Sequence, residues 1–417
     1  MRLVAALCLT ATLASPLLAN NWPNWRGPNY NGVASGKDYP MEWSATKNIA
    51  WKVELPGRGS STPVVWGDHI FLTSADEGKN ALLAFNRHGK EMWRVLIGKD
   101  RPGKNKKASG SNPSCVTDGE HVFAYFKSGD LMCVDFAGKL VWQTNVQDKF
   151  GEDTLWWDLG TSPVLTKSHC VVAVMQTGPS FLVAFDKSTG KVDWKQDRNV
   201  DAPEESAHSY STPVVLNKNG TETLVVLGAD HVTAHDAVNG QELWRVGGLN
   251  PDPAAEKRLR SIASAVASNE IVIAPYVRGK ELTAIKLGGH GDVTKSHVAW
   301  KKIGIGTDVP TPAVADGKVY LLGDRGQVTC LEILTGKEIW SGTTEKNRGA
   351  YSSSPILADG KVYATREDGV TFVLSAGPEF KVLGRNELDG TQTVATPVFI
   401  DGKILIRTDT HLYCIGL

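Results

Sequence analysis

The sequence predicts an all-β fold, an eight-bladed β-propeller with four-stranded antiparallel blades. A small residue followed by proline, or a close equivalent, opens an apolar segment eight times along the 417 residues, at intervals of 42 to 52 residues. A tryptophan closes most of these units, and glycine-containing turns recur inside them. Repeats of this length, built from short strands and tight turns, are typical of propellers. The eight openings are Thr62-Pro63, Asn112-Pro113, Ser162-Pro163, Thr212-Pro213, Ser264-Ala265, Thr311-Pro312, Ser354-Pro355 and Thr396-Pro397.

Each unit is predicted to contain four short strands in sequence order. In the third unit, residues 162–165, 170–174 and 181–185 are apolar and form the first three strands. The turn at residues 186–191 then leads to a fourth strand that contains Trp194. Aspartate and threonine side chains bond back to the backbone of such a turn, and glycine takes the positive φ that closes it.

The last unit is incomplete, because the chain ends at Leu417 after three strands. A matching fourth strand is present near the other end, at residues 48–53. We expect this N-terminal strand to complete the last blade, because closing the ring removes both sheet edges. The tryptophans that end units one to six are Trp93, Trp142, Trp194, Trp244, Trp300 and Trp340, and unit seven has Leu383 in that region.

The pattern Ala-x-Asp-x-x-Thr-Gly-x-x-x-Trp, found from Ala184 to Trp194, resembles the pyrroloquinoline-quinone (PQQ) repeat. The opening at residues 21–29 resembles the start of exported bacterial propellers of that family, and the resemblance covers the chain after residue 20. The family holds quinone-dependent dehydrogenases and also cofactor-free proteins, among them the propeller subunit of the outer-membrane barrel-assembly machinery. The resemblance therefore implies the fold without deciding the activity.

Three segments follow from these patterns. Residues 1–19 are predicted to be a secretory signal, because Arg2 precedes an apolar run that ends at Ala19. Residues 20–47 are rich in Asn, Gly, Pro and Trp and are expected to form an irregular clasp on a propeller face. Residues 48–417 then form the propeller. We expect an exported protein, periplasmic or secreted, that acts as a monomer.

Composition argues against two classes of partner. The chain has 45 basic and 45 acidic residues, so its net charge is zero and it lacks the excess of positive charge typical of nucleic-acid binding. No stretch after the signal is long and apolar enough to span a membrane. One basic loop, residues 99–107, carries five Lys or Arg residues and one Asp, and is expected to be a solvated surface loop.

The five cysteines of the mature chain are expected to be structural. Cys133, Cys330 and Cys414 occupy the third-strand position that alanine fills in other units, and buried cysteine serves as a small apolar residue. Cys115 and Cys133 lie on strands too far apart for a disulfide. No Cys-x-x-Cys or similar spacing indicates a metal site.

The residues just before each first strand are expected to surround one mouth of the central axis. Long polar side chains are concentrated there, and convergent polar groups around a concavity are typical of binding sites. The alternative is that each residue stabilises its own turn. The predicted mouth residues are Arg58, Asp158, His208, Tyr210, Arg260, Asp308, Arg348 and Tyr351.

Asp158 is the candidate catalytic residue if the protein is an enzyme. The segment 155–158 resembles a Trp-Asp segment of quinone-dependent dehydrogenases, which implies that Asp158 is a general base. The chain lacks the adjacent cysteines on which those enzymes stack their cofactor. Trp156 and Trp157 are therefore expected to anchor the loop on the mouth face. His208, near Glu204 and Glu205, is expected to be a solvated mouth residue, with a general base or metal ligand as the alternative.

Three functional hypotheses follow. The first is a non-catalytic, cofactor-free scaffold that binds a protein or glycan partner on a propeller face. The second is an alcohol or sugar dehydrogenase that uses PQQ and calcium, with Asp158 as the base. The third is a propeller that binds a glycan or small molecule in the same mouth. Trp22 and Trp25 are expected to pack on a propeller face as buried anchors, with stacking on a carbohydrate as the alternative.

Overall fold

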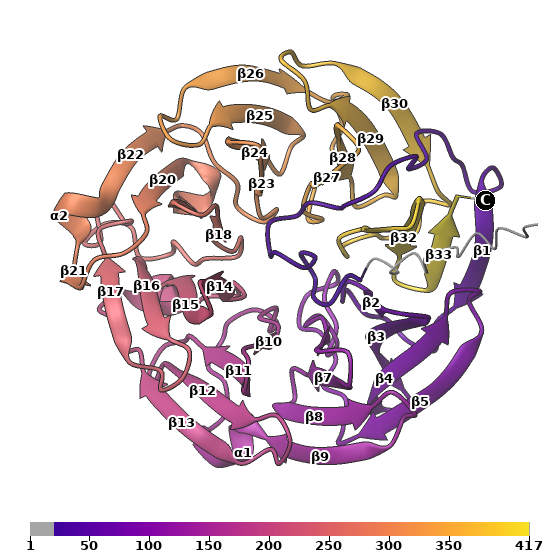
Figure 1. The fold of residues 1–417 in the computed structure, drawn as a ribbon, viewed down its shortest axis with the longest axis horizontal. Helices are drawn as coiled ribbons and strands as arrows, with labels where there is room; N and C mark the ends of the chain where they lie inside the picture. Colours follow the sequence, from indigo (N-terminus) through magenta and orange to yellow (C-terminus); the bar gives the residue numbers. More distant parts are fainter. Residues whose placement is uncertain (1–20, 417) are drawn as a thin grey trace, which may run out of the picture.

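The computed structural model describes residues 21–416 and forms a closed ring of eight β-sheets around a central axis (Figure 1). Each sheet contains four antiparallel strands, and one blade has an added fifth strand. The predicted eight-bladed propeller is therefore confirmed. The predicted signal, residues 1–19, lies outside the described residues.

In blades 1 to 7 the strands run outward from the axis in chain order. Blade 1 contains β2 (Val64–Trp66), β3 (His69–Asp76), β4 (Lys79–Asn86) and β5 (Glu91–Ile97). Blade 2 contains β6 (Val116–Thr117), β7 (His121–Tyr125), β8 (Asp130–Asp135) and β9 (Leu140–Asn145). Blade 3 contains β10 (Val164–Leu165), β11 (His169–Val174), β12 (Phe181–Asp186) and β13 (Val192–Asp197). Blade 4 contains β14 (Val214–Lys218), β15 (Thr221–Gly228), β16 (His231–Asp236) and β17 (Glu242–Val246).

The remaining blades repeat this order. Blade 5 contains β18 (Val266–Ala267), β19 (Ile271–Tyr276), β20 (Glu281–Lys286) and β22 (Val298–Ile303). Blade 6 contains β23 (Ala313–Ala315), β24 (Lys318–Leu322), β25 (Gln327–Glu332) and β26 (Glu338–Thr343). Blade 7 contains β27 (Ile356–Ala358), β28 (Lys361–Thr365), β29 (Val370–Ser375) and β30 (Val382–Glu387). Blade 8 contains β31 (Val398–Ile400), β32 (Lys403–Arg407), β33 (His411–Ile415) and the N-terminal β1 (Ile49–Glu54).

Short elements interrupt the repeat at a few connections. Blade 4 gains an unpredicted fifth strand, β21 (Gly291–Asp292), which pairs parallel to β17. The other short elements are α1 (Val146–Phe150), α2 (Thr294–His297) and the 3₁₀ turns η1 (Glu204–Ala207) and η2 (Val277–Gly279). No helix of residues 21–416 has the length and apolar character needed to cross a membrane.

The N-terminal strand closes the ring as predicted. β1 pairs antiparallel with β33, and Trp51 lies opposite Cys414. Trp51 therefore occupies the position in blade 8 that Trp93 and Trp142 hold in blades 1 and 2, opposite Ala84 and Cys133. The last blade thus takes its outer strand, and its tryptophan, from the start of the propeller segment.

The pairing of the outer two strands explains why the third strand carries a small residue opposite the tryptophan. In seven blades the residue opposite the tryptophan is alanine or cysteine, at a point where the strand pairing shifts register or a bulge forms. The five described cysteines are free and buried, and burial raises the pKa of the Cys133 thiol to about 12. In blade 7 the tryptophan position is Gly384, opposite Val373 and one residue after Leu383.

Five of the seven tryptophans also pack on a glycine in the last turn of the next blade. A Cβ atom added at Gly240 would lie 2.4 Å from the Trp194 ring, and one at Gly190 would lie 2.5 Å from the Trp142 ring. The Trp142 indole N–H also donates to the Lys187 carbonyl at 2.7 Å. Glycine is required at these turns both for its positive φ and because the indole leaves no room for a side chain.

Replacing Gly240 with alanine is expected to lower the free energy of unfolding by about 3 kcal/mol, because the new methyl group meets Trp194 and the φ of +78° disfavours a side chain. Gly220→Ala is the matched control, because its φ is +84° and no atom lies within 4 Å of the added Cβ. It should cost about 1 kcal/mol. Urea unfolding of both variants measures the difference, and equal losses would show that the tryptophan contact contributes nothing.

The clasp, residues 21–47, crosses the centre of the ring (Figure 1). Trp22 pairs with Val65, and Ala34 donates to the Leu357 carbonyl at 2.8 Å. The buried Arg26 donates to the carbonyls of Pro312 and Pro355 at 2.7 and 3.0 Å. The clasp therefore binds the first strands of blades 1, 6 and 7 and covers one face, here called the clasp face.

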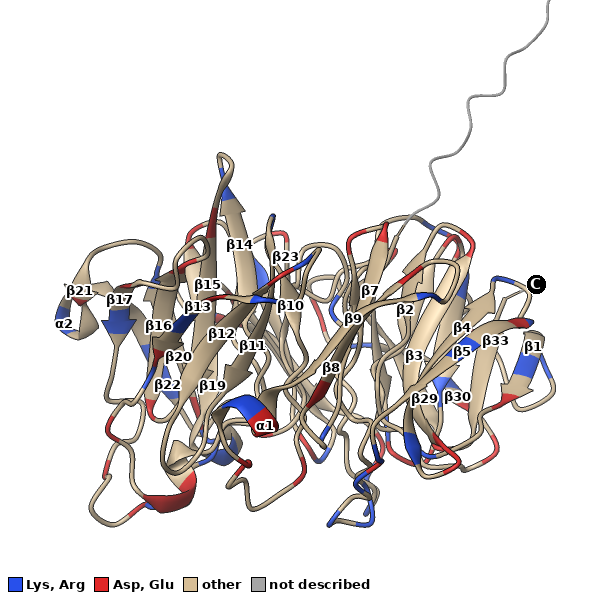
Figure 2. Cartoon of the chain, turned by 90° about the horizontal axis from the view of Figure 1, so that it is seen from below, with Lys and Arg blue, Asp and Glu red and all other residues tan. Residues whose placement is uncertain are grey.

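The two faces of the ring differ in the segments they carry. Figure 2 shows the ring from the side, with the hairpin that follows β14 projecting from one face and charged loops from the other. The hairpins between first and second strands lie on the clasp face, and the connections between blades lie on the opposite face, here called the mouth face.

Candidate functional site

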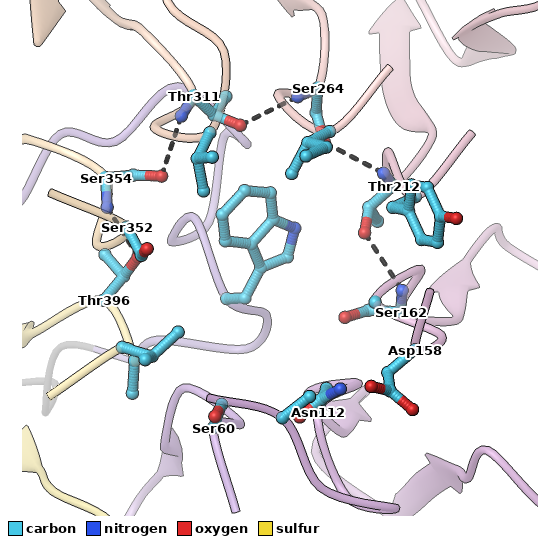
Figure 3. A pocket seen from close by; sticks show the side chains of 18 of the residues that line it. Ser60, Asn112, Asp158, Ser162, Thr212, Ser264, Thr311, Ser352, Ser354 and Thr396 are labelled. Atoms are coloured by element: carbon cyan, nitrogen blue, oxygen red, sulfur yellow. Dashed lines mark hydrogen bonds between the residues drawn. The ribbon is translucent and has the colours of Figure 1, made fainter. Parts of the chain in front are cut away.

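Side-chain hydroxyls from all eight blades form a closed ring around the axis, and Figure 3 shows the part of it from Ser162 to Ser354. The backbone N–H of each member donates to the side-chain oxygen of the member in the next blade, at 2.8 to 3.2 Å, and Thr396 donates back to Thr62. This hydroxyl ring joins all eight blades. It consists of Thr62, Ser114, Ser162, Thr212, Ser264, Thr311, Ser354 and Thr396.

The hydroxyl ring corrects one predicted opening. Blade 2 contributes Ser114, followed by Cys115, and the predicted Asn112-Pro113 lies two residues earlier. Asn112 instead accepts a hydrogen bond from the Ser109 backbone N–H at 2.9 Å. The hydroxyl, rather than the proline that usually follows it, is thus the feature common to all eight positions.

The hydroxyl ring encloses an axial cavity of about 540 Å³. Its lining includes one aromatic side chain from the clasp, Trp25, and two from the mouth loops, Trp157 and Tyr210. Because the clasp crosses the opposite face, the cavity is a chamber that faces the mouth. Small-molecule sites in proteins commonly have about this volume.

Four of the eight predicted mouth residues are brought together beside this chamber. Asp158, Tyr210 and Arg260 line it, and an Asp308 carboxylate oxygen lies 3.2 Å from an Arg260 guanidinium nitrogen. Arg260 also lies 3.7 Å from Glu205, whose carboxylate accepts a hydrogen bond from the Trp157 indole. A charged network therefore connects blades 3 to 6 at one side of the mouth.

The other four predicted residues do not line the chamber. Arg58 is half exposed and pairs with Asp409 at 2.6 Å. Tyr351 is buried and its hydroxyl lies 2.8 Å from that of Thr344, while Arg348 is exposed. Tyr351 thus stabilises its own loop, as in the alternative, whereas Arg58 joins other segments by contacting Asp409 and the Lys106 carbonyl.

His208 is buried, contrary to the expectation of a solvated mouth residue. Its Nε2 lies 2.8 Å from the Thr177 hydroxyl, and its ring packs edge-on against Trp156 with centroids 5.5 Å apart. Burial lowers the pKa of His208, so the imidazole is neutral near pH 7. The His208 ring thus packs against the loop that carries Trp156.

Asp158 is held in a buried ion pair with Lys127, a residue that the sequence patterns did not single out. Its two carboxylate oxygens also accept from the backbone N–H groups of Lys104 and Asn105, at 2.9 and 3.0 Å. Burial opposes ionisation, but the ammonium and the two N–H donors outweigh it and lower the pKa of Asp158. A carboxylate with these partners is a poor proton acceptor.

The basic loop, residues 99–107, is exposed to solvent and lies across part of the mouth. Asp158 and Lys127 bind its backbone from blades 2 and 3, with Lys127 donating to the Pro102 carbonyl at 2.7 Å. Lys107 reaches Glu367 of blade 7, at 2.6 Å. All five Lys and Arg side chains of the loop are exposed, as expected for a solvated surface loop, but polar partners from three blades also hold its backbone in place.

The chamber does not fit a calcium-bound quinone cofactor. Calcium requires six to eight oxygen ligands, usually including several carboxylates. Asp158 is the one carboxylate among the described residues that line the chamber, and both of its oxygens are engaged. Within residues 21–416, no cluster of three His, Cys, Asp or Glu side chains could hold a metal ion.

Comparison with known proteins identifies the repeat. The family model described as "Outer membrane protein assembly factor BamB" matches residues 30–181, 157–290 and 291–377. A relative with that name from Yersinia pestis is 22% identical over 330 residues, which cover 76% of this chain and 75% of the relative. The match extends across most of the ring.

Solved structures share the fold. The crystal structure of BamB from Moraxella catarrhalis matches with a TM-score of 0.64 and 14% identity, covering 88% of this chain and 99% of that one. A quinohemoprotein alcohol dehydrogenase from Comamonas testosteroni matches with a TM-score of 0.68 and 12% identity, covering 97% and 82%. At these identities both likenesses show the fold alone. Because the family model covers most of the chain, the protein belongs to the family of outer membrane protein assembly factor BamB, a family of PQQ-repeat β-propellers.

Proposed function

We propose that the protein is an exported, cofactor-free scaffold that binds a partner protein through its mouth face. The name of its family supports a role in the assembly of outer-membrane proteins. Export rests on the predicted signal at residues 1–19. The observation that carries the proposal is a pair of exposed tryptophans at the mouth.

Trp156 and Trp157 are 49% and 47% exposed, although tryptophan is usually well buried. They lie next to each other on the connection between blades 2 and 3. Exposed aromatic side chains of this size are enriched at protein interfaces and often dominate their energetics. The pair is therefore the proposed centre of the docking surface.

The loop that carries the pair is fixed before any partner binds. The Trp157 backbone N–H donates to the Tyr210 hydroxyl at 3.1 Å, and its indole N–H donates to Glu205 at 2.8 Å. Lys104 donates to the Leu155 carbonyl at 2.8 Å, and His208 packs against Trp156. A preorganised loop loses little conformational entropy on binding, which favours affinity.

The same contacts support a non-catalytic role. Asp158, the candidate general base, is occupied by Lys127 and two backbone N–H groups and stabilises the basic loop. The chamber also lacks the carboxylate ligands that calcium requires. Calcium-dependent, one-to-one binding of PQQ to the purified protein, measured by calorimetry, would contradict this part of the proposal.

The docking surface can be tested by photo-cross-linking in the cells that produce the protein. With a photoreactive phenylalanine analogue in place of Trp157, we expect a discrete cross-linked product that contains an outer-membrane assembly protein. Leu334 is the matched control position, because it is 55% exposed but lies in a turn on the clasp face.

The analogue at Leu334 should give no such product. Two results would overturn the proposed surface. One is the absence of a discrete product from position 157 when the exported protein is present at its normal level. The other is the same product from both positions, since they lie on opposite faces of the ring.

A further inference from the structure

The tryptophan of blade 4 lacks both contacts that its counterparts make with the next blade. Five of the seven tryptophans pack on a glycine of the following turn, and five donate the indole N–H to a carbonyl of the next blade. Among the described residues, Trp244 makes neither contact. Trp194 also lacks a partner for its N–H, but Gly240 packs on its ring. Departures from a repeat are expected where a protein has a function.

The connection within blade 5 explains this exception. Residues 287–297 join β20 to β22 and include β21 and α2, whereas residues 187–191 join the equivalent strands of blade 3. β21 pairs with β17, so the connection passes along the outer edge of blade 4. A Cβ atom added at Gly288 or Gly291 would have no atom within 4 Å, so neither glycine packs on the indole. Insertions in repeat proteins often lie on a binding face.

A groove of about 1100 Å³ lies beside Trp244 on the clasp face. Its lining includes residues 215–219 of β14 and the turn after it, residues 287–290 of the blade 5 connection, and Asn29 and Asn31 of the clasp. The side chain of Trp244 is 3% exposed and lines this groove, and its N–H has no partner among the described residues. A buried indole N–H usually has an acceptor, so this one indicates a ligand that supplies it.

β14 presents an unpaired backbone edge to the groove. It contains five residues, whereas the first strands of the other blades contain two or three, and with β15 it projects from the clasp face (Figure 2). β15 pairs with one edge of β14, and no described segment pairs with the other. Successive side chains of a strand point to opposite faces, so lining by the consecutive residues 215–219 indicates that the free edge faces the groove. Free edges of this kind accept an added strand.

The side chains of the groove favour an uncharged polypeptide. Lys218 and Asp316 contribute opposite charges, and Val215 and Leu216 are partly exposed and offer apolar contacts. Asparagine amides both donate and accept hydrogen bonds, as a peptide backbone requires of its partners. The buried ring of Trp244 offers no face for stacking on a sugar, which disfavours a glycan. The asparagines that line the groove are Asn29, Asn31, Asn217, Asn219 and Asn269.

We propose that this groove binds an extended, uncharged segment of a partner polypeptide, which adds a strand to β14 and supplies a backbone carbonyl to the Trp244 N–H. The equivalent N–H of Trp142 binds a backbone carbonyl, that of Lys187, at 2.7 Å. The site lies on the clasp face and is separate from the proposed docking surface at the mouth. Loss of cross-linking at Trp157 would leave it intact, and its failure would leave the docking surface intact.

Calorimetric titration of the purified protein with a capped, uncharged heptapeptide of alternating threonine and valine tests this site. We expect saturable one-to-one binding with a Kd of about 1 mM or lower. The same peptide with N-methyl groups on its three central residues cannot donate to a strand from either edge. It should bind at least about tenfold more weakly, because strand addition depends on main-chain hydrogen bonds.

Two variants locate the binding. Trp244→Phe keeps a ring but removes the N–H, and should weaken peptide binding about fivefold. Trp194→Phe is the matched control and should leave binding unchanged, because its N–H also lacks a partner but the residue does not line the groove. Ala267 is partly exposed and lines the groove, so Ala267→Phe should weaken binding by filling it. Circular dichroism checks the folding of each variant.

The indole N–H signal of Trp244 in a nitrogen–proton correlation spectrum reports on the same contact. Its absence from the spectrum of Trp244→Phe assigns it. The signal should shift as the peptide saturates the protein, whereas the signal of Trp194 should stay in place.

Any of four results would overturn the proposal. These are no saturable binding of the peptide up to about 5 mM, equal affinity for the N-methylated peptide, unchanged affinity in both Trp244→Phe and Ala267→Phe, and a dimer of the protein that the peptide dissociates. The last result would assign the groove to a second copy of the chain. If Trp244→Phe fails to fold, Ala267→Phe and the N-methylated peptide decide the matter.

Discussion

Removal of residues 21–54 is expected to destabilise the propeller by more than about 5 kcal/mol, which is comparable with the whole stability of many domains. The deletion takes away β1 and leaves blade 8 with an unpaired outer edge along β33. It also removes Trp51, which packs on Gly89 of blade 1 and donates to the Arg87 carbonyl at 2.8 Å.

The clasp also contributes to the stability that the deletion removes. Trp22, Tyr39 and Trp43 are at most 4% exposed, and burial of each side chain contributes about 1.5–3 kcal/mol. Arg26 joins the first strands of the neighbouring blades 6 and 7. Its guanidinium is fully buried among carbonyl groups, and this burial lowers its pKa to about 9.

Urea unfolding followed by tryptophan fluorescence measures the effect of the deletion. Arg58→Ala is the control, because Arg58 is a half-exposed mouth residue whose exposed pair with Asp409 should contribute at most about 1 kcal/mol. A truncated protein that melts at the same urea concentration as the intact chain would refute closure of the ring by β1.

The second large effect is expected for Asp158→Asn. This change leaves the Lys127 ammonium buried without its carboxylate, and breaking one partner of a buried pair costs about 3–5 kcal/mol. The basic loop should also be released, because Lys104 and Asn105 lose charged acceptors for their backbone N–H groups. Thermal unfolding measures the first effect, and faster amide hydrogen exchange in residues 99–107 measures the second.

The same pair predicts a dependence on pH. Because the folded-state pKa of Asp158 is lowered, the pair contributes its full stability above the unfolded pKa of about 4. That contribution is lost as the pH falls through the lower folded pKa. The stability difference between the wild type and Asp158→Asn should therefore be constant near neutral pH and shrink under strongly acidic conditions.

A double variant separates a structural role from a catalytic one. Lys127→Met combined with Asp158→Leu should recover much of the lost stability, because an apolar pair can replace a buried ion pair. Unchanged stability in Asp158→Asn, together with loss of a quinone-dependent activity, would instead favour the dehydrogenase reading.

Much of the fold was predictable because its signals are local. The turns that precede Trp142 and Trp194 carry their own glycine, and the alternation of strands and turns repeats in every unit. The N-terminal strand was also predictable, since β1 carries the tryptophan that blade 8 lacks. The misplaced opening at Asn112 shows the limit of such local patterns. Asn112 precedes a proline, as most members of the hydroxyl ring do, but the residue that bonds to Ser162 is Ser114.

The site was predicted less well than the fold. Asp158, Tyr210 and Arg260 were found because residues before each first strand must lie near the axis. The same register selected His208 and Tyr351, which are buried in contacts within and between loops. Register decides where a backbone lies, but whether a side chain turns to the axis depends on neighbours from other blades.

The sequence by itself thus determined the ring, its eight blades and its closure by the N-terminal strand, because strand period and turn chemistry are properties of each unit. The tertiary structure alone decided what occupies the axis. Trp25 of the clasp lines the axial chamber, and Lys127 of blade 2 forms an ion pair with Asp158. Lys107 of the basic loop forms an ion pair with Glu367 of blade 7. These contacts join segments that only the closed ring brings together, so no pattern within one unit could predict them.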